Sequence, residues 1–250
     1  MAVVRTRSTR ARSAVFAPIS NQGRAVRVEQ RLAQAIWSGL LSDGEKLPSE
    51  SELAAMLGVA TVTAREALIS LRAQGLVTTI RGRGGGSFVT RPSRAVDENL
   101  RKRIGSMTRV ELADRGVHYA TVLSGCAELA AERANDDELD ELHSIIPDVD
   151  AVGVDYWRHA DTELNLAIAA LSHSAHLTRN VINLEMEFGA LLRIPFSSSD
   201  AWPQIRGQQV GLVAAIAAHD PATARSSMRT RVRDSLRQLA VLHAQLRSQK

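Results

Sequence analysis

The sequence predicts a mainly α-helical protein: a small N-terminal domain with one two-stranded hairpin, followed by an all-α antiparallel helical bundle. Three observations support this fold class. Ala and Leu are abundant whereas aromatic residues make up 4% of the chain, which favours helices over sheets. Apolar residues recur at helical spacing almost everywhere after residue 92. At 250 residues, the chain is long enough for two modest domains.

The first helices are predicted from apolar spacing and from capping residues. A helix over residues 24–39 is indicated by apolar residues four apart, namely Val28, Leu32 and Ile36. Ser49 precedes Glu52 by three residues, a capping box that predicts the start of a second helix. Gly58 is expected to end that helix, because glycine readily adopts positive φ. Its apolar face is predicted to contain Leu53, Met56 and Leu57.

A third helix is predicted over residues 61–74, and a hairpin follows it. The inner side of this helix is formed by Ala64, Ala67, Leu68 and Leu71. Ala60 would be a poor cap, so Thr61 is expected to cap instead. Residues 76–80 and 87–90 read as two strands. This order is typical of a winged helix-turn-helix, which places the later helix in the DNA major groove and the hairpin beside it. An ordinary helical hairpin followed by two strands is the alternative.

Positive charge is concentrated in the same part of the chain. Residues 1–92 hold 13 of the 31 Lys and Arg residues and 6 of the 27 Asp and Glu residues, a balance of +7 against −3 for the remainder. This distribution favours contact with DNA phosphates. The candidate DNA-binding side chains are Ser49, Ser51, Thr61, Thr63, Arg65, Arg72, Arg81 and Arg83.

The pattern divides the chain into four segments. Residues 1–22 form a basic arm that contacts the DNA backbone or is simply disordered, and residues 23–91 form the DNA-binding domain. A linker over 92–106 precedes a helical domain over 107–247. Helices are predicted over the ranges 94–104, 107–133, 136–146, 152–172, 176–193, 203–219 and 221–247. The helical domain is expected to be an antiparallel bundle.

Polar residues interrupt the apolar faces of three of these helices. Asp161 lies among apolar residues of the 152–172 helix, with Asn165 one turn later; Gln209 and Arg231 occupy similar positions in the last two helices. Charged groups directed into a bundle are costly unless they meet partners. One interpretation is an internal Asp161–Arg231 ion pair with Gln209 satisfying the remaining hydrogen bonds. The other is a ligand pocket lined by these groups, and both can hold together.

Several motifs resemble one family of regulators. The segments LPSESELA, LGV, AREAL, LRAQGLV and RGRG…SFV are similar to the DNA-binding domain of GntR-superfamily transcription regulators. DTELNLAIAALSHSAHL and AAIAAHDPATARSSMRTRV resemble the helical FCD ligand domain of its FadR-like branch. The resemblance implies a homodimer that binds an inverted-repeat operator in double-stranded DNA, with a repressor more common than an activator.

Individual positions both follow and depart from the family pattern. Arg65 matches a DNA-contacting arginine and Thr63 a contacting hydroxyl, whereas Ser51 and Thr61 stand where arginines are common. Many relatives bind a divalent metal through one Asp and three His. Asp161 matches the Asp, but the histidine positions hold Asn165, Gln209 and Arg231. Arginine cannot ligate zinc, so no metal or other cofactor is expected. Arg231 is expected instead to bind a small anionic metabolite.

Other functional classes find less support in the sequence. No nucleophile–base pattern, phosphate-binding glycine loop or metal motif indicates an enzyme. A ligand-independent DNA-binding regulator with a closed Asp161–Arg231 pair stays an alternative. The longest apolar run, Val210–Ala218, is too short to span a bilayer, so a cytoplasmic protein without a membrane partner is expected. The single cysteine, Cys126, excludes an internal disulfide and is expected to be buried.

Overall fold

The computed structural model describes residue 16 and residues 24–90, 93–148, 153–194 and 198–248. The chain divides into two compact units, Met1–Val96 and Asp97–Lys250, and the division falls within helix α5 (Ser93–Ser106). Apart from residue 16, the predicted basic arm lies outside the described residues. No single described helix is both long and apolar enough to cross a bilayer, although the bent pair α3 and α4 reaches those limits when taken together.

The first unit begins with three helices, as predicted. Helix α2 (Arg24–Ser38) buries Val28, Leu32 and Ile36 and packs on α4. Helix α3 (Glu50–Leu57) starts at a complete capping box between Ser49 and Glu52. It ends at Gly58, which adopts a left-handed conformation with φ 66°.

Two details of these helices differ from the prediction. Helix α4 (Thr61–Ala73) begins after Ala60, which makes no side-chain capping bond, so the prediction that Thr61 caps the helix is wrong. Met56 was expected on the apolar face of α3 but is 39% exposed, whereas Leu53 and Leu57 are buried. The inner side of α4 is buried as predicted.

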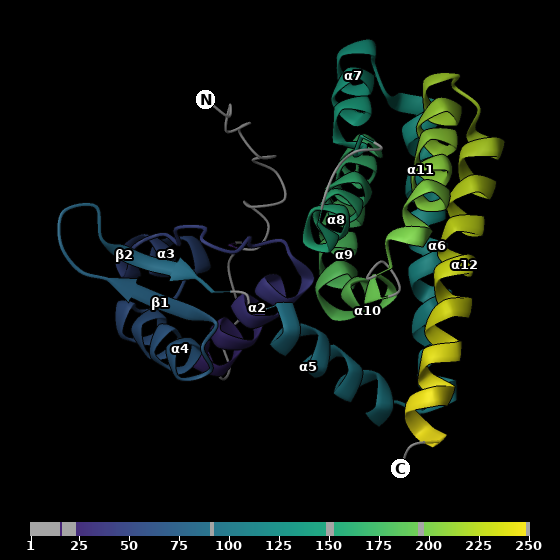
Figure 1. Cartoon of the computed structure of the whole chain (residues 1–250). Helices are drawn as coiled ribbons and strands as arrows, with labels where there is room; N and C mark the ends of the chain where they lie inside the picture. The colour runs from purple at the N-terminus through teal and green to yellow at the C-terminus, as the bar shows by residue number, and fades with distance from the viewer. Residues whose placement is uncertain (1–15, 17–23, 91–92, 149–152, 195–197, 249–250) are drawn as a thin grey trace. The chain divides into compact units, whose positions relative to one another are not determined.

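The segment before α3 pairs with the hairpin, a contact that the sequence did not predict. Strands β1 (Val77–Ile80) and β2 (Gly86–Val89) pair antiparallel, with Val77 opposite Val89, and their loop extends beyond the helices of this unit in Figure 1. Lys46 forms an isolated bridge with Phe88, and its ammonium lies 5.8 Å from the Phe88 ring centroid. The segment before α3 therefore fastens the hairpin along β2.

The second unit is a helical bundle. Its elements after α5 are α6 (Arg109–Arg133), α7 (Asp136–Ile145), α8 (Val154–Leu171), α9 (Ala175–Leu184), a π-helix η1 (Glu185–Gly189), α10 (Ala190–Leu192), a short η3 (Ser199–Ala201), α11 (Trp202–Ala217) and α12 (Pro221–Ser248). Helices α6 and α12 share the most extensive contact and lie side by side in Figure 1. They run antiparallel, since His243 contacts Met107 and Arg225 contacts Glu128.

One predicted helix of this bundle contains a π-helical turn. A helix was expected over 176–193, and the chain is helical from Ala175 to Leu192, with one π-helical turn at Glu185–Gly189 between α9 and α10. A π-turn adds a residue to the turn and changes which side chains face the core. It places Glu185 fully inside the bundle, and Cys126 is also buried, as expected.

Candidate nucleic-acid interface and buried polar cluster

Helices α3 and α4 have the geometry of a helix-turn-helix. They are bent by 112° across the short turn that begins at Gly58. This angle lies within the range of roughly 90–120° that is usual for the motif. The outer side of α4 exposes Thr61, Val62 and Arg65 near its N-terminus, the end that contacts base edges in such motifs.

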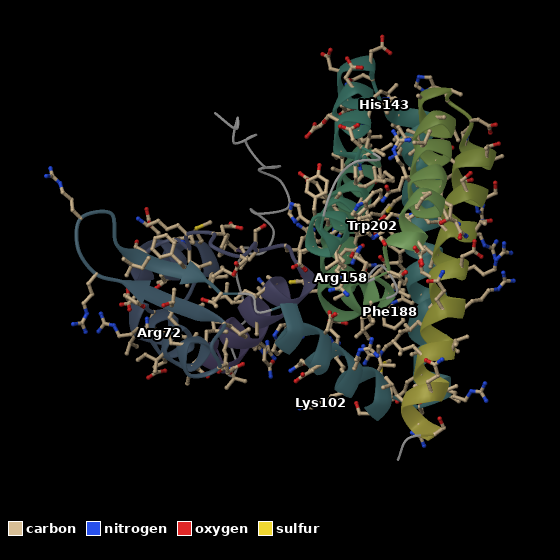
Figure 2. The ribbon with its side chains drawn as sticks, viewed as in Figure 1. Arg72, Lys102, His143, Arg158, Phe188 and Trp202 are labelled. Carbon is tan, nitrogen blue, oxygen red and sulfur yellow. The ribbon has the colours of Figure 1, made fainter. Side chains whose placement is uncertain are left out.

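The arginines of this surface have identifiable neighbours. The Nε of Arg65 donates to Glu50 Oε2 at 2.8 Å, although the Arg65 side chain remains 59% exposed. Exposed pairs of this kind are weak, so DNA can compete for the guanidinium. Arg72, which is labelled in Figure 2, donates from Nη1 to Thr79 Oγ1 at 3.1 Å, and this bond links α4 to β1.

The remaining predicted DNA-binding residues fall into three groups. The Ser49 hydroxyl is engaged in the α3 cap and lies 3.2 Å from that of Ser51. Thr63 is half-buried on α4. Arg81 and Arg83 are exposed on the hairpin loop, whose Gly84 carbonyl accepts from Lys46 at 3.4 Å. The structure therefore brings these residues to the helix-turn-helix and the hairpin of one unit.

A buried network of polar side chains occupies the second unit. We name it the polar cluster, and its members are Tyr119, Asp161, Asn165, Glu185, Arg193, Gln209 and Arg231. All of them are less than a tenth exposed. They come from α6, α8, the π-helix, the end of α10, α11 and α12, so the cluster joins most of the bundle.

Asp161 is the centre of one half of the polar cluster. Its Oδ1 accepts from Arg231 Nη1 at 2.5 Å and from Gln209 Nε2 at 3.1 Å, and its Oδ2 accepts from Arg193 Nε at 2.7 Å. Burial alone would raise the pKa of Asp161. The charges of Arg231 and Arg193 outweigh burial and hold that pKa below its ordinary value.

Glu185 is the centre of the other half. Its Oε2 accepts from Arg193 Nη2 at 2.5 Å, and its Oε1 accepts from Tyr119 at 2.7 Å and from Asn165 Nδ2 at 2.9 Å. Arg193 thus bridges the two carboxylates. Burial alone would lower the pKa of Arg193. The charges of Glu185 and Asp161 raise this pKa by more than burial lowers it, so it lies above the ordinary value and the guanidinium stays charged.

Asn165 closes the network between the two halves. Its Oδ1 accepts from Arg231 Nη2 while its amide nitrogen donates to Glu185. Burial and the charge of Glu185 raise the pKa of Tyr119 well above its ordinary value, so this hydroxyl stays protonated and donates. The ring of Tyr119 packs edge-to-face on Phe188, with centroids 5.9 Å apart.

Three polar atoms of the cluster lack a hydrogen-bond partner among the described residues. They are Nη1 of Arg193, Nε of Arg231 and Oε1 of Gln209. Buried polar atoms without a partner are uncommon because each costs desolvation free energy. All three belong to side chains that donate to Asp161 through another nitrogen.

Sequence reasoning predicts four members of the cluster and misses three. Asp161, Asn165, Gln209 and Arg231 are brought together as expected from their positions on apolar helix faces. Tyr119, Glu185 and Arg193 were not predicted, and neither was the π-turn that carries Glu185. The available signal was Glu185 standing among apolar residues in the segment NVINLEMEFGALLRI.

Comparison with known proteins supports one family assignment. Residues 24–88 match the bacterial regulatory proteins of the gntR family, and residues 119–234 match the FCD domain. RmpR of Mycobacterium gastri carries the name of an HTH-type transcriptional regulator. It is 31% identical to this chain over 215 residues, which cover 85% of this chain and 78% of RmpR. The chain belongs to the GntR family.

Further relatives of this GntR-family chain match over shorter spans. The HTH-type transcriptional repressor NanR of Cronobacter sakazakii is 31% identical over 131 residues, which cover 50% of this chain and 48% of NanR. The solved structure of E. coli McbR/YncC has the same fold, with a TM-score of 0.54, 18% identity and coverage of 90% of this chain and 99% of that one. The chain is therefore a transcription regulator with a DNA-binding helix-turn-helix domain and an FCD domain.

The polar cluster does not suit the divalent metal that many FCD domains hold. The only carboxylate at the matched positions, Asp161, already faces the guanidiniums of Arg193 and Arg231. Guanidinium offers donors and no lone pair to a cation, and its charge repels one. Within the described residues, no group of three or more His, Cys, Asp or Glu side chains is placed to hold a metal ion.

Proposed function

We propose that this GntR-family chain is a homodimeric repressor whose operator affinity changes when a small metabolite with an anionic group binds at the polar cluster. The operator would be an inverted repeat in double-stranded DNA, because a two-fold dimer matches a two-fold site. Repression is proposed because the NanR relatives are transcriptional repressors by name. As a DNA-binding regulator, it would act in the cytoplasm.

DNA recognition would centre on the N-terminal part of α4. Arg65 projects from this helix beside Thr61 and Thr63, and Arg81 and Arg83 on the hairpin loop supply positive charge for backbone phosphates. Ala60 leaves the first N–H groups of α4 without a side-chain cap, which suits a phosphate oxygen at that helix end. Few groove arginines remain, so Arg65 would provide most of the guanine recognition.

The observation that carries the proposed ligand response is the set of three unpartnered atoms in the polar cluster. A purely structural ion-pair network is expected to satisfy every buried donor and acceptor. Here two guanidinium donors and one amide acceptor are left over on the three side chains that donate to Asp161. An anionic group would accept from Arg193 and Arg231 without requiring either to leave its present partner.

The contacts of α5 suggest how such binding would be transmitted. Arg158 on α8 donates from Nη1 to Asp97 of α5 at 2.7 Å and from Nε to the Arg193 carbonyl at 3.1 Å. Arg103 of α5 donates to the carbonyl of Glu187 in the π-helix. The segment that carries Glu185 and Arg193 is therefore linked to α5 by hydrogen bonds. A shift of this segment would move α5, which leads to the DNA-binding unit.

The DNA-binding part is tested with Arg65→Ala. An operator selected from random duplexes should bind this variant roughly 5- to 150-fold more weakly, equivalent to about 1–3 kcal/mol for a lost base contact. Fluorescence anisotropy at fixed salt measures the change. Arg225→Ala is the matched control, because Arg225 also forms an exposed ion pair but lies in the second unit. Equal affinity of the wild type for all duplexes at low salt would contradict the proposal.

A ligand-independent regulator is the second candidate function. It is favoured by the closed Asp161–Arg231 pair, whose atoms lie 2.5 Å apart. Melting of the wild type with small organic acids, amino acids and acyl-CoA esters separates the two candidates, since a ligand-responsive protein is stabilised by its ligand. Equal ligand-induced shifts in the wild type and in Arg231→Ala would remove Arg231 from the proposed site.

A further inference from the structure

The charges of the polar cluster balance. Asp161 and Glu185 carry two negative charges, and Arg193 and Arg231 carry two positive charges, all of them buried. In each carboxylate, both oxygens accept at least one hydrogen bond within the cluster. The site is thus electrically neutral before any ligand arrives.

The unpartnered atoms belong to three side chains that contact one carboxylate. Arg193, Arg231 and Gln209 each donate to Asp161 through one nitrogen, and each has a further polar atom without a partner among the described residues. Two of these atoms, Nη1 of Arg193 and Nε of Arg231, are N–H donors that require an acceptor. The third, Oε1 of Gln209, is an acceptor that requires a donor.

We propose that the effector is a zwitterion of the α-amino-acid class, with its carboxylate bound by Arg193 and Arg231 and its ammonium bound by Gln209. This inference rests on the ligand response proposed above and specifies its chemistry. A carboxylate satisfies the two unpartnered guanidinium donors. An ammonium satisfies the acceptor and cancels the charge that the carboxylate brings.

Charge balance argues against a simple anion. A ligand that carries one negative charge and no positive charge would leave a net charge in a cluster that is almost completely buried. An uncompensated buried charge is strongly unfavourable, whereas a neutral pair of opposite charges exchanges with the existing pairs at little electrostatic cost. A 2-hydroxy acid has nearly the shape and the hydrogen-bonding groups of the corresponding amino acid but lacks this balance.

The first experiment compares matched ligands. Melting temperatures of the full-length protein at pH 7 are measured with the common amino acids, with the 2-hydroxy acids that carry the same side chains, and with acetate and methylamine. We expect at least one amino acid to raise the melting temperature and to bind about tenfold or more tightly than its hydroxy acid. A hydroxy acid or acetate that stabilises as well as every amino acid would overturn the inference.

A charge variant tests the physical reason. Glu185→Gln keeps the side-chain shape but gives the cluster a net positive charge, so the preference should shift from the amino acid toward its hydroxy acid. Glu187→Gln is the matched control, because it removes the same charge from an exposed position of the same π-helix and should leave the preference unchanged. An unchanged preference in folded Glu185→Gln would overturn the inference; if that variant does not fold, the wild-type comparison decides.

Operator binding distinguishes failure of the inference from failure of the proposed function. If a hydroxy acid stabilises the protein and changes operator affinity while amino acids do neither, the regulator is ligand-responsive and the inferred zwitterion is wrong. If no compound of this panel changes the melting temperature while operator binding is intact, the inferred zwitterion is wrong, and the wider panel of organic acids and acyl-CoA esters decides the ligand response.

Discussion

Gly189 makes room for the ion pair between Glu185 and Arg193. A Cβ atom at this position would lie 2.1 Å from Glu185 Oε2 and 2.8 Å from Arg193 Nη1. Gly189→Ala should therefore displace both charged groups and lower the free energy of unfolding by roughly 1–3 kcal/mol, as overpacking does in cores. Chemical denaturation followed by circular dichroism measures this change.

Gly211 supplies the control for that substitution. It lies within α11, and a Cβ there would meet nothing within 4 Å. Gly211→Ala should leave stability unchanged or increase it by up to about 1 kcal/mol, because alanine favours the helix. Equal effects of the two substitutions on the free energy of unfolding would mean that the tight contact at Gly189 does not affect stability.

The depressed pKa of Asp161 makes a prediction about stability at low pH. The folded pKa lies below the ordinary value of about 3.9, so the contribution of Asp161 is complete above that pH and is lost as the pH falls below it. Asp161→Asn should be destabilised by roughly 3–5 kcal/mol at pH 7 because two buried guanidiniums lose a partner. Its stability should fall less than that of the wild type below about pH 4.

An exposed ion pair provides the comparison for Asp161. Glu128 pairs with Arg225 at 3.3 Å near the surface. Glu128→Gln should change the free energy of unfolding by less than about 1 kcal/mol, since such pairs contribute little. If Asp161→Asn were equally mild, the polar cluster would not contribute to stability in the way that its burial indicates.

At the residue scale, sequence predicts those members of the site that break a regular pattern. Asp161, Gln209 and Arg231 each interrupt an apolar stripe of period 3.6, so their inward direction follows from helix geometry. Glu185 and Arg193 lie eight residues apart, a spacing that places two residues on the same face of a continuous α-helix. The π-turn at Glu185–Gly189 changes the helical phase between them, and nothing in local propensity fixes the position of such a turn.

Individual elements are predicted well where caps and breakers define them. Ser49 with Glu52 fixes the start of α3, and Gly58 fixes its end, because these bonds form between residues close in sequence. The bridge between Lys46 and Phe88 was not predicted. It depends on the path of the chain before α3, which short-range patterns do not determine.

The uncapped start of α4 leads to a prediction at the scale of one element. Ala60 is exposed and has the extended backbone of a capping residue, with φ −70° and ψ 149°, but offers no hydrogen-bond acceptor on its side chain. Ala60→Ser should stabilise the first unit by about 1 kcal/mol. Denaturation of the full chain, monitored by circular dichroism, gives the change.

The control for this substitution places the same residue type inside a helix. Ala55 is exposed in the interior of α3. Ala55→Ser should destabilise by up to about 0.7 kcal/mol, since serine has the lower helix propensity. Similar effects of Ala55→Ser and Ala60→Ser would show that position relative to the helix start is unimportant and that the cap assignment is wrong.

At the scale of the whole molecule, the distribution of charge along the chain already distinguishes the roles of the two units. The excess of positive charge lies in residues 1–92, where phosphates would be bound, while the remaining residues carry a small negative balance. Charge asymmetry says nothing about how the units communicate. That question depends on α5, whose hydrogen bonds to Arg158 and to the Glu187 carbonyl join residues far apart in sequence.

Asp97 is the residue at which this communication is best tested. It accepts from Arg158, which also holds the Arg193 carbonyl, so Asp97→Asn weakens the link between α5 and the cluster without altering the cluster itself. The ligand-induced melting shift and operator binding without ligand should persist. The ligand-induced change in operator affinity should fall by roughly fivefold, because a partly exposed charge-assisted bond contributes about 1 kcal/mol. Asp234→Asn, which breaks a contact with Arg237 away from α5, should keep the full change. If Asp97→Asn also kept it, the response would have to reach the DNA-binding unit by another route.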